Sequence, residues 1–459
     1  MNALGVSVLT SLVAIVLLAP RRLSLLALMG GVLFLPHGQS ITAFGLNLFP
    51  WRFLELAAFV RVVQRSELPS QLTRIDHALI WAYVYVTVVY LLRTAFGYGT
   101  SADVAVTSNL SKFGLMIDVL LAYSALRGLI TNAADVRWFL VRFLAILVPY
   151  VLLLIVERST GSNPLSLLGT SKIAIWIDDD GTRVRCLGSF MHPSLLGTVG
   201  ASFLLLYLGL CLCRSHRIPA ITGVALCVAI VMLANSGGPL TFMMVGMAVW
   251  CLWPLRKHLP FISSSILLAL VGLALLMNAP VWHLPTKMSA LFGGSGWHRS
   301  YLMEQGFGNI DKWWLAGMPL DLTSSWFPYL VLGAADMTNV YLAFGVDGGL
   351  LAIFLFVLLV VRAFRAVAAA LSLVRRTNPY SKENEVLLWG LGAVLAGHIV
   401  NFMAITYFDQ TNFFWLMHIA AISSVTQALA RRPAFSESSR KGKASLEPPL
   451  SVASRNSTY

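Results

Sequence analysis

Long apolar runs separated by short polar stretches fill most of the chain. A helix needs roughly 20 apolar residues to cross the hydrocarbon core of a bilayer, and most of the runs come close to that length. The first three are short, so we expect about twelve or thirteen crossings and predict an all-α, polytopic membrane protein. The runs cover residues 2–19, 23–36, 50–64, 77–95, 110–131, 137–156, 189–213, 219–235, 238–255, 260–278, 338–361, 386–406 and 412–430.

Composition and charge support this class and exclude others. Of 459 residues, 57% are hydrophobic and only 12% are charged, and the mean hydropathy is +0.75, which a soluble domain of this length could not sustain. In a soluble protein a net charge of +13 would suggest a nucleic-acid partner. Here the basic residues gather in short loops and in the C-terminal segment, which is typical of the cytoplasmic side of a membrane protein and excludes nucleic acid.

The distribution of lysine and arginine also predicts the orientation. Most of the 33 basic residues fall in alternate loops that include the C-terminus, which places these loops in the cytoplasm. The loops at 157–188 and 279–337 and the turns near Ser236 and Asp409 then face the periplasm. We expect one transmembrane domain over residues 1–430, followed by a disordered, basic cytoplasmic tail over residues 431–459 that lies near anionic lipid.

The cysteines and the N-terminus give no evidence for a disulfide framework, a zinc site or a signal peptide. The five cysteines are odd in number and mostly lie in or beside apolar runs, so no disulfide framework or zinc-ligand spacing follows. The first apolar run has no basic stretch before it and no small-residue cleavage motif after it, and we therefore expect no cleavable signal.

The segment from Glu157 to Gly197 is the most polar interruption of the chain. It contains Arg183, Arg185, His192 before a proline, and three consecutive acids at 178–180. Because apolar runs flank it on both sides, its polar groups must lie at a membrane surface or in a cavity that opens to one. We interpret the segment as the rim of a site, and the three acids as solvated loop residues.

Aromatic residues characterise the second periplasmic loop, 279–337. This composition is typical of segments that lie in the headgroup region, and an ordinary aromatic belt explains it equally well. We expect a short helix at Arg299–Ile310 that lies on the membrane and covers a cavity. The tryptophans of the loop are Trp282, Trp297, Trp313, Trp314 and Trp326.

Four ionisable residues, Glu55, Asp118, His398 and His418, fall inside apolar runs. Such residues are rare within membranes and are functional candidates, for example in a proton-coupled transporter. Their irregular spacing instead favours hydrogen bonding between helices, or a local pair of Glu55 with Arg52.

Several short motifs, taken in order, resemble the O-antigen ligase and polymerase superfamily, and most closely its exopolysaccharide-polymerase branch. They cover about residues 150–420, and each is weak alone, whereas their order and spacing are fairly specific. The motifs are Glu157 with Thr160, Gly161, Ser162 and Asn163; Arg185 to Gly188, with His192, Pro193 and Gly197; Ser236 to Pro239; Arg299 with Trp313, Trp314 and Gly317; Ala335 to Asn339 with Gly348 and Gly349; and Tyr407 to Gln410.

This resemblance implies a GT-C-like fold and a glycosyltransferase activity. The enzyme would act at the periplasmic face of the bacterial inner membrane on undecaprenyl-diphosphate-linked oligosaccharides, in the synthesis of exopolysaccharide, O-antigen or lipopolysaccharide. The implied partners are this lipid-linked substrate, membrane lipid, and flippase and chain-length regulator proteins. No cofactor or metal is implied. Ligases of the superfamily commonly carry a histidine where this chain has Thr338, and this departure favours a polymerase.

Arginine suits the chemistry of such a reaction. Displacing a lipid diphosphate from an anomeric carbon develops negative charge on the leaving phosphate, and preorganised cations stabilise that charge. The planar guanidinium pairs bidentately with phosphate oxygens, which removes the need for a metal. We expect Arg185 and Arg299 to act in catalysis, and Arg183 to bind either substrate or lipid headgroups.

The acceptor hydroxyl must lose a proton as it attacks, and a carboxylate is suited to accept it. Our first choice is Asp336, with Thr338 and Asn339 binding the acceptor sugar, although a helix cap would explain Asp336 equally simply. The other polar residues expected at the substrate are Glu157, His192 and Asp409, and His192 could instead cap a helix.

Three functions remain open from the sequence. The first is a polymerase that joins lipid-linked repeat units, and the second is a ligase that transfers a finished glycan to a lipid or protein acceptor. The third is a transporter or flippase that moves a lipid-linked oligosaccharide without making a bond. A transporter should carry polar residues in both halves of the bundle and internal repeats. The one-sided polar residues of this chain favour the two enzymes.

Overall fold

The computed structural model is mostly helical and describes residues 1–43, 46–96, 102–170, 172–178, 181–258, 297–326, 330–331, 334–377 and 382–444, with isolated positions at 268, 272, 275 and 276. The long helices are α1 (Ala3–Leu18), α2 (Arg21–Phe34), α3 (Pro50–Gln64), α4 (Arg74–Ala95), α5 (Ala102–Leu129), α6 (Ala133–Thr160), α7 (Pro193–Cys211), α8 (Arg217–Ala234), α9 (Gly237–Cys251), α14 (Val340–Thr377), α15 (Lys382–Asn401) and α16 (Gln410–Ala444). Twelve of the thirteen predicted apolar runs coincide with these helices. The remaining run, 260–278, lies almost wholly outside the described residues.

Short elements connect the helices. The 3-10 helices are η1 (Pro164–Leu168), η2 (Arg214–His216), η3 (Trp253–His258) and η5 (Leu320–Trp326), and the short α-helices are α12 (Trp297–Gly308) and α13 (Ile310–Trp313). Three antiparallel hairpins pair β1 (Ile41–Ala43) with β2 (Leu46–Leu48), β3 (Trp176–Ile177) with β4 (Val184–Arg185), and β5 (Leu330–Val331) with β6 (Ala334–Ala335). The helix expected at Arg299–Ile310 is therefore confirmed as α12.

By length and composition, seven helices of the described chain could cross a membrane: α4, α5, α6, α7, α8, α14 and α16. Helices α1 and α9 are apolar but shorter, and α2 and α3 are also short. The protein is thus a helical membrane protein. The larger number of crossings expected from the sequence stays a prediction.

Helix α7 forms the centre of one half of the bundle, where it packs against α8, α9 and α15. Nearly all of its residues are buried, and small residues bring its neighbours close. A side chain added at Gly197 would approach Pro239 to 2.7 Å, and one at Gly200 would approach Ile230 to 2.8 Å. Close packing through small residues is how membrane helices associate without a hydrophobic driving force between them.

A kink in α14 attaches the outer segment 310–318 to the bundle. Gly348 and Gly349 have non-helical backbone angles, with φ +77° at Gly349. The kink leaves helical backbone groups free, and the outer segment satisfies two of them: Leu350 N donates to Trp314 O at 2.7 Å, and Met318 N donates to Val346 O at 2.8 Å. The outer segment is therefore fixed to a membrane helix.

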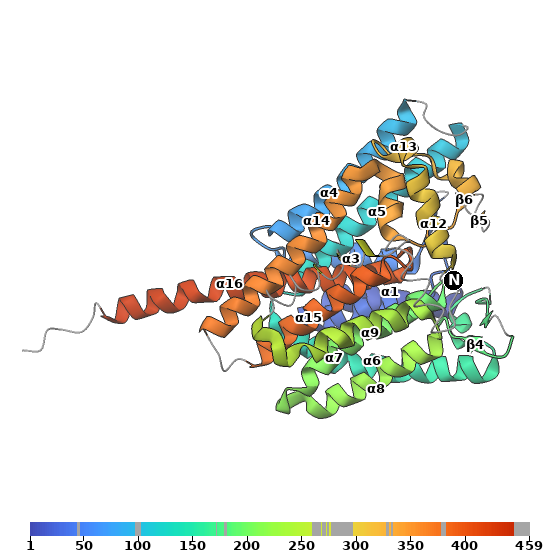
Figure 1. Ribbon diagram of the computed structural model, residues 1–459. Helices are drawn as coiled ribbons and strands as arrows, with labels where there is room; N and C mark the ends of the chain where they lie inside the picture. Colours follow the sequence, from blue (N-terminus) through green and yellow to red (C-terminus); the bar gives the residue numbers. More distant parts are fainter. Residues whose placement is uncertain are drawn as a thin grey trace, which may run out of the picture.

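The polar connections gather at one end of the bundle. In Figure 1, α12 and strands β4, β5 and β6 lie together with the N-terminus at the right-hand end, whereas α16 extends to the left. Helix α16 is assigned as far as Ala444, and the disordered tail expected from residue 431 onward stays a prediction. Residues 445–459 lie outside the described chain.

Candidate active site around Arg185 and Arg299

Residues 187–191, between the β3–β4 hairpin and α7, are held by a network of buried polar groups. The carboxylate of Glu157, in the last turn of α6, accepts from Leu187 N at 2.8 Å and from Gly188 N at 3.0 Å. Asn163 donates from Nδ2 to Gly188 O at 2.7 Å. Glu157 is only 1% exposed, so these bonds are shielded from water. One carboxylate thus replaces the missing secondary structure of this segment.

Helix α16 holds the same segment from the other side. Asp409 caps the helix by accepting from Thr411 N at 2.9 Å, and its second oxygen accepts from Met191 N at 3.1 Å. Gln410 donates from Nε2 to Ser189 O at 3.2 Å and to Leu35 O at 2.9 Å. The last of these bonds reaches the end of α2. Segments more than 200 residues apart in the chain therefore meet on these five residues.

Arg185 lies just before this segment, on β4. The hairpin places it directly opposite Trp176, and the Arg158 guanidinium donates to the backbone carbonyl of Val184 beside it. Asp178 Oδ1 lies 3.7 Å from Arg185 Nε, which is too long for a hydrogen bond. Arg185 Nε is buried and has no hydrogen-bond partner.

Arg299 lies in the first turns of α12 and is also left without a partner at its buried Nε. Burial and the positive charge of Arg185 lower the pKa of Arg299 from its ordinary value. Two like charges near one another with unpaired donors are unfavourable unless an anion lies between them. The structure therefore places within electrostatic range the two arginines that the sequence selected from separate loops, and their binding of an anion stays a prediction.

His192 joins the same group as an uncharged hydrogen-bond donor. It caps α7, with Nδ1 accepting from Ser194 N at 3.1 Å. Burial, and then the charges of Arg185 and Arg299, lower its pKa to about 4. The neutral ring carries one proton, and since Nδ1 accepts a hydrogen bond, that proton must be on Nε2. His192 is therefore both a helix cap and a donor beside the two arginines, and it is poorly suited to act as a base.

Asp336, Thr338 and Asn339 lie on the segment that enters α14. Asn339 is 2% exposed and caps the helix through Oδ1, which accepts from Leu342 N at 3.0 Å. Its Nδ2 lies 3.0 Å from Met303 Sδ on α12. Because Arg299 and Met303 are four residues apart, they share one face of α12, and the segment passes close to Arg299. The hydroxyl of Thr338 is buried without a partner.

Asp336 is the one carboxylate of this segment. Its side chain is exposed, and surrounding protein on one side raises its pKa above the ordinary value. No ion pair to Asp336 is found among the described residues. The expected role of Asn339 as a sugar ligand stays a prediction, since its amide groups have partners within the protein.

For the remaining predicted residues, the structure gives a position but does not test substrate binding. Arg183 is exposed near the tip of the hairpin, where its carbonyl accepts from Asp178 N at 2.9 Å. Of the three consecutive acids, 179 and 180 lie outside the described residues. Both oxygens of Glu157 and of Asp409 bond backbone N–H groups, so substrate binding by these two acids stays a prediction.

The buried ionisable residues form two other clusters. Arg52 donates to Asp118 Oδ2 from Nε at 2.9 Å and from Nη2 at 2.6 Å. The expected pair of Glu55 with Arg52 is therefore wrong as a hydrogen-bonded pair, because the guanidinium faces Asp118. Both oxygens of Glu55 are buried without a partner.

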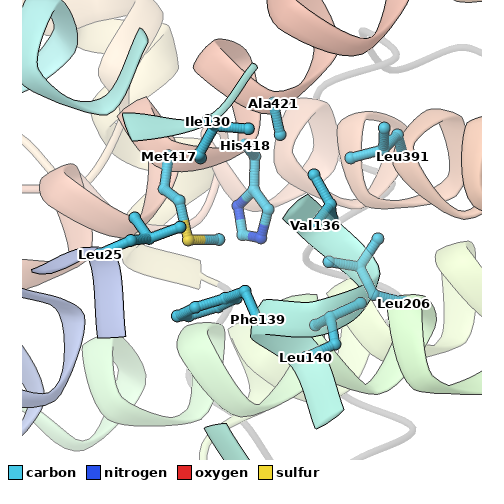
Figure 2. A pocket seen from close by; sticks show the side chains of 10 residues that line it. All are labelled: Leu25, Ile130, Val136, Phe139, Leu140, Leu206, Leu391, Met417, His418 and Ala421. Atoms are coloured by element: carbon cyan, nitrogen blue, oxygen red, sulfur yellow. The ribbon is translucent and has the colours of Figure 1, made fainter. Parts of the chain in front are cut away.

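The second cluster joins α15 to α16 by a chain of hydrogen bonds. Asn401 donates to Tyr407 Oη at 2.9 Å, and the same hydroxyl is hydrogen-bonded to His398 Nδ1 at 2.8 Å. His398 Nε2 then lies 3.3 Å from His418 Nδ1. Figure 2 shows the His418 ring among apolar side chains that line a small cavity, and its Nε2 has no partner. The helix-to-helix hydrogen bonding expected for the histidines is confirmed.

The structure adds a residue that the sequence did not single out. Trp176 lies in an irregular polar segment, and its ring meets the His192 ring edge to face at 4.6 Å. Only the pairing of β3 with β4, which links positions nine residues apart, places Trp176 beside Arg185. Among the described residues, no three His, Cys, Asp or Glu side chains lie together as metal ligands would.

Compared with known proteins, the chain matches no family model and no curated sequence.

Asp409 should make the stability of the fold depend on pH. Burial raises its pKa from 3.8 to about 6, so the folded state holds this proton more tightly than the unfolded state. The contribution to the unfolding free energy is therefore largest below about pH 4, falls as the pH rises to about 6, and is constant above that. Thermal unfolding of the purified protein across this range should show the decline.

Asp409→Asn should remove this decline. It should also lower stability at every pH, because an amide cannot accept from both Met191 N and Thr411 N. An unchanged pH slope in Asp409→Asn would show that another group is responsible.

Proposed function

We propose that the chain is a glycosyltransferase of the bacterial inner membrane that joins undecaprenyl-diphosphate-linked oligosaccharide repeat units into exopolysaccharide or O-antigen. The observation that carries the proposal is the convergence of Arg185 and Arg299, whose buried Nε groups make no hydrogen bond. A helical membrane bundle with two neighbouring arginines at its polar end suits a lipid-linked diphosphate, since the isoprenoid chain stays in the bilayer. The charge distribution of the loops supports a periplasmic site and a cytoplasmic C-terminus.

The reaction transfers a glycan from one lipid diphosphate to a sugar hydroxyl. The acceptor oxygen bonds to the anomeric carbon of the donor while the bond from that carbon to the diphosphate oxygen breaks. Undecaprenyl diphosphate leaves with the electron pair, and negative charge grows on its phosphate. Arg185 and Arg299 stabilise that charge in a partly buried site, where such contacts are worth more than in water.

Asp336 accepts the proton of the acceptor hydroxyl. Its carboxylate is exposed to an incoming sugar, and its raised pKa makes it a stronger base than an ordinary aspartate. Asn339, three residues after Asp336, contacts α12, and this contact supports a position of Asp336 near Arg299. Ligases of the resembled superfamily commonly carry a histidine where this chain has Thr338. A base at Asp336 instead is consistent with a polymerase, whose acceptor is a second lipid-linked repeat unit.

The product formed from purified lipid-linked repeat units tests the proposal. We expect lipid-linked chains of several repeats and free undecaprenyl diphosphate. Activity should persist after divalent ions are chelated, because the arginines supply the positive charge. Transfer only to an added lipid or protein acceptor would establish a ligase. Movement of the substrate across vesicles with no new glycosidic bond would establish a transporter.

Lysine substitutions test the arginines. Arg185→Lys and Arg299→Lys keep the charge but lose the planar fork, so each should lower turnover by on the order of 10² to 10³. Lys312→Ala provides a control on the same side of the molecule, where the residue is exposed and its ammonium donates to Asn309 Oδ1. Wild-type turnover in both lysine variants at normal protein level would show that the two arginines have no catalytic role and serve as contacts to lipid headgroups.

Asp336→Asn tests the base. The amide is nearly isosteric and the residue is exposed, so folding and membrane insertion should be unaffected while turnover falls by about 10² or more. Binding of the lipid-linked substrate should be retained, because Asp336 acts in proton transfer and not in holding the diphosphate. If turnover stays near the wild-type value, proton transfer does not depend on Asp336.

A further inference from the structure

Trp176 and Arg185 share one face of the β3–β4 hairpin. They are directly opposite partners in the antiparallel pair, so their side chains project to the same side. The Trp176 side chain is 40% exposed, and part of its remaining surface contacts the His192 ring. A large aromatic surface is thus held open immediately beside an arginine with an unpaired donor.

His192 contributes a polar group next to this aromatic surface. Its Nδ1 is occupied by Ser194 N at 3.1 Å, which leaves Nε2–H as the donor. No acceptor for Nε2 is found among the described residues. The pair therefore offers an apolar face and one neutral donor, whereas Arg185 and Arg299 offer charge.

We propose that Trp176 and His192 form the subsite for the sugar that is attached to the diphosphate; this inference rests on the proposed function. The C–H groups on one face of a pyranose ring pack against the electron-rich face of an aromatic ring. The neutral Nε2–H suits a hydroxyl or acyl oxygen on the same sugar. Side chains opposite one another on antiparallel strands start about 5 Å apart, which matches the spacing of a sugar ring and the phosphate bonded to it.

The geometry also argues against a subsite for the lipid chain. An isoprenoid chain needs apolar contacts along its length, and it has no acceptor for the hydrogen bond that His192 Nε2–H can donate. Ile175 and Ile177 are also exposed, but they alternate with Trp176 along the strand and point to the other face of the hairpin. Trp176 therefore lies on the same face of the hairpin as Arg185, while the isoleucines point to the opposite face.

Binding to two probes tests the subsite: a polyprenyl diphosphate without sugar, and the same lipid carrying a single hexose. The wild type should bind the glycosylated lipid more tightly. Trp176→Ala should weaken binding of the glycosylated lipid by about 3- to 10-fold and leave the sugar-free lipid unchanged. Trp176→Phe, which keeps a smaller aromatic face, should lie between the two.

His192→Asn adds a second variant, since asparagine is a good helix cap but does not reach as far as Nε2. It too should weaken only the glycosylated lipid. Trp314→Ala is a matched control, because Trp314 is 51% exposed and directly follows α13, away from the hairpin. This variant should leave both affinities unchanged.

Two outcomes separate this inference from the proposed function. Equal loss of both lipids in Trp176→Ala would make the residue a lipid anchor and overturn the sugar subsite, while the lipid-diphosphate site would stand. Failure of the wild type to bind either diphosphate would overturn the proposed function itself.

Discussion

The bond pair between the Glu157 carboxylate and the N–H groups of Leu187 and Gly188 is the constraint on which the site depends. Residues 187–191 have no regular secondary structure, yet they pass through the protein interior, where every polar backbone group needs a partner. Glu157 supplies two acceptors from α6, and Asp409 supplies a third from α16. Because these helices belong to the packed bundle, the start of α7 and the position of Arg185 are fixed by the membrane domain itself.

Arg127 and Arg61 differ from Arg185 and Arg299 in having side chains that are fully paired within the protein. Arg127 pairs with Asp76 at 3.0 Å, and Arg61 donates to three backbone carbonyls in addition to Glu67. These arginines are satisfied within the protein and connect its helices. Arg185 and Arg299 each leave a buried Nε without a hydrogen bond, as do Arg21 and Arg93, but the positive charge of Arg185 also lowers the pKa of Arg299. Burial without a partner costs free energy, and a bound anion offsets it.

The proposed anion site combines residues from three parts of the chain, each held in place by different contacts. The hairpin carries Arg185 and Trp176, the start of α7 carries His192, and the separate helix α12 carries Arg299. The kink of α14 fixes the outer segment after α12 through Leu350 N and Met318 N. The segment containing Asp336 then enters α14 beside α12. The charged groups, the neutral donor and the carboxylate thus lie on short connections between rigid helices, which favours precise placement of a substrate.

Apolar periodicity and charge bias determined the membrane class, the helix positions and the residue types of the site. These properties are local, since an apolar run of given length can be satisfied in lipid only as a helix. The convergence of Arg185 with Arg299 was predicted only as a hypothesis, because contacts across more than 100 residues leave no periodic signal. The pairing of Arg52 with Asp118 rather than Glu55, and the place of Trp176 beside Arg185, could not be read from the sequence. Tertiary packing decided them, because the partner of a buried charge depends on which helix faces it.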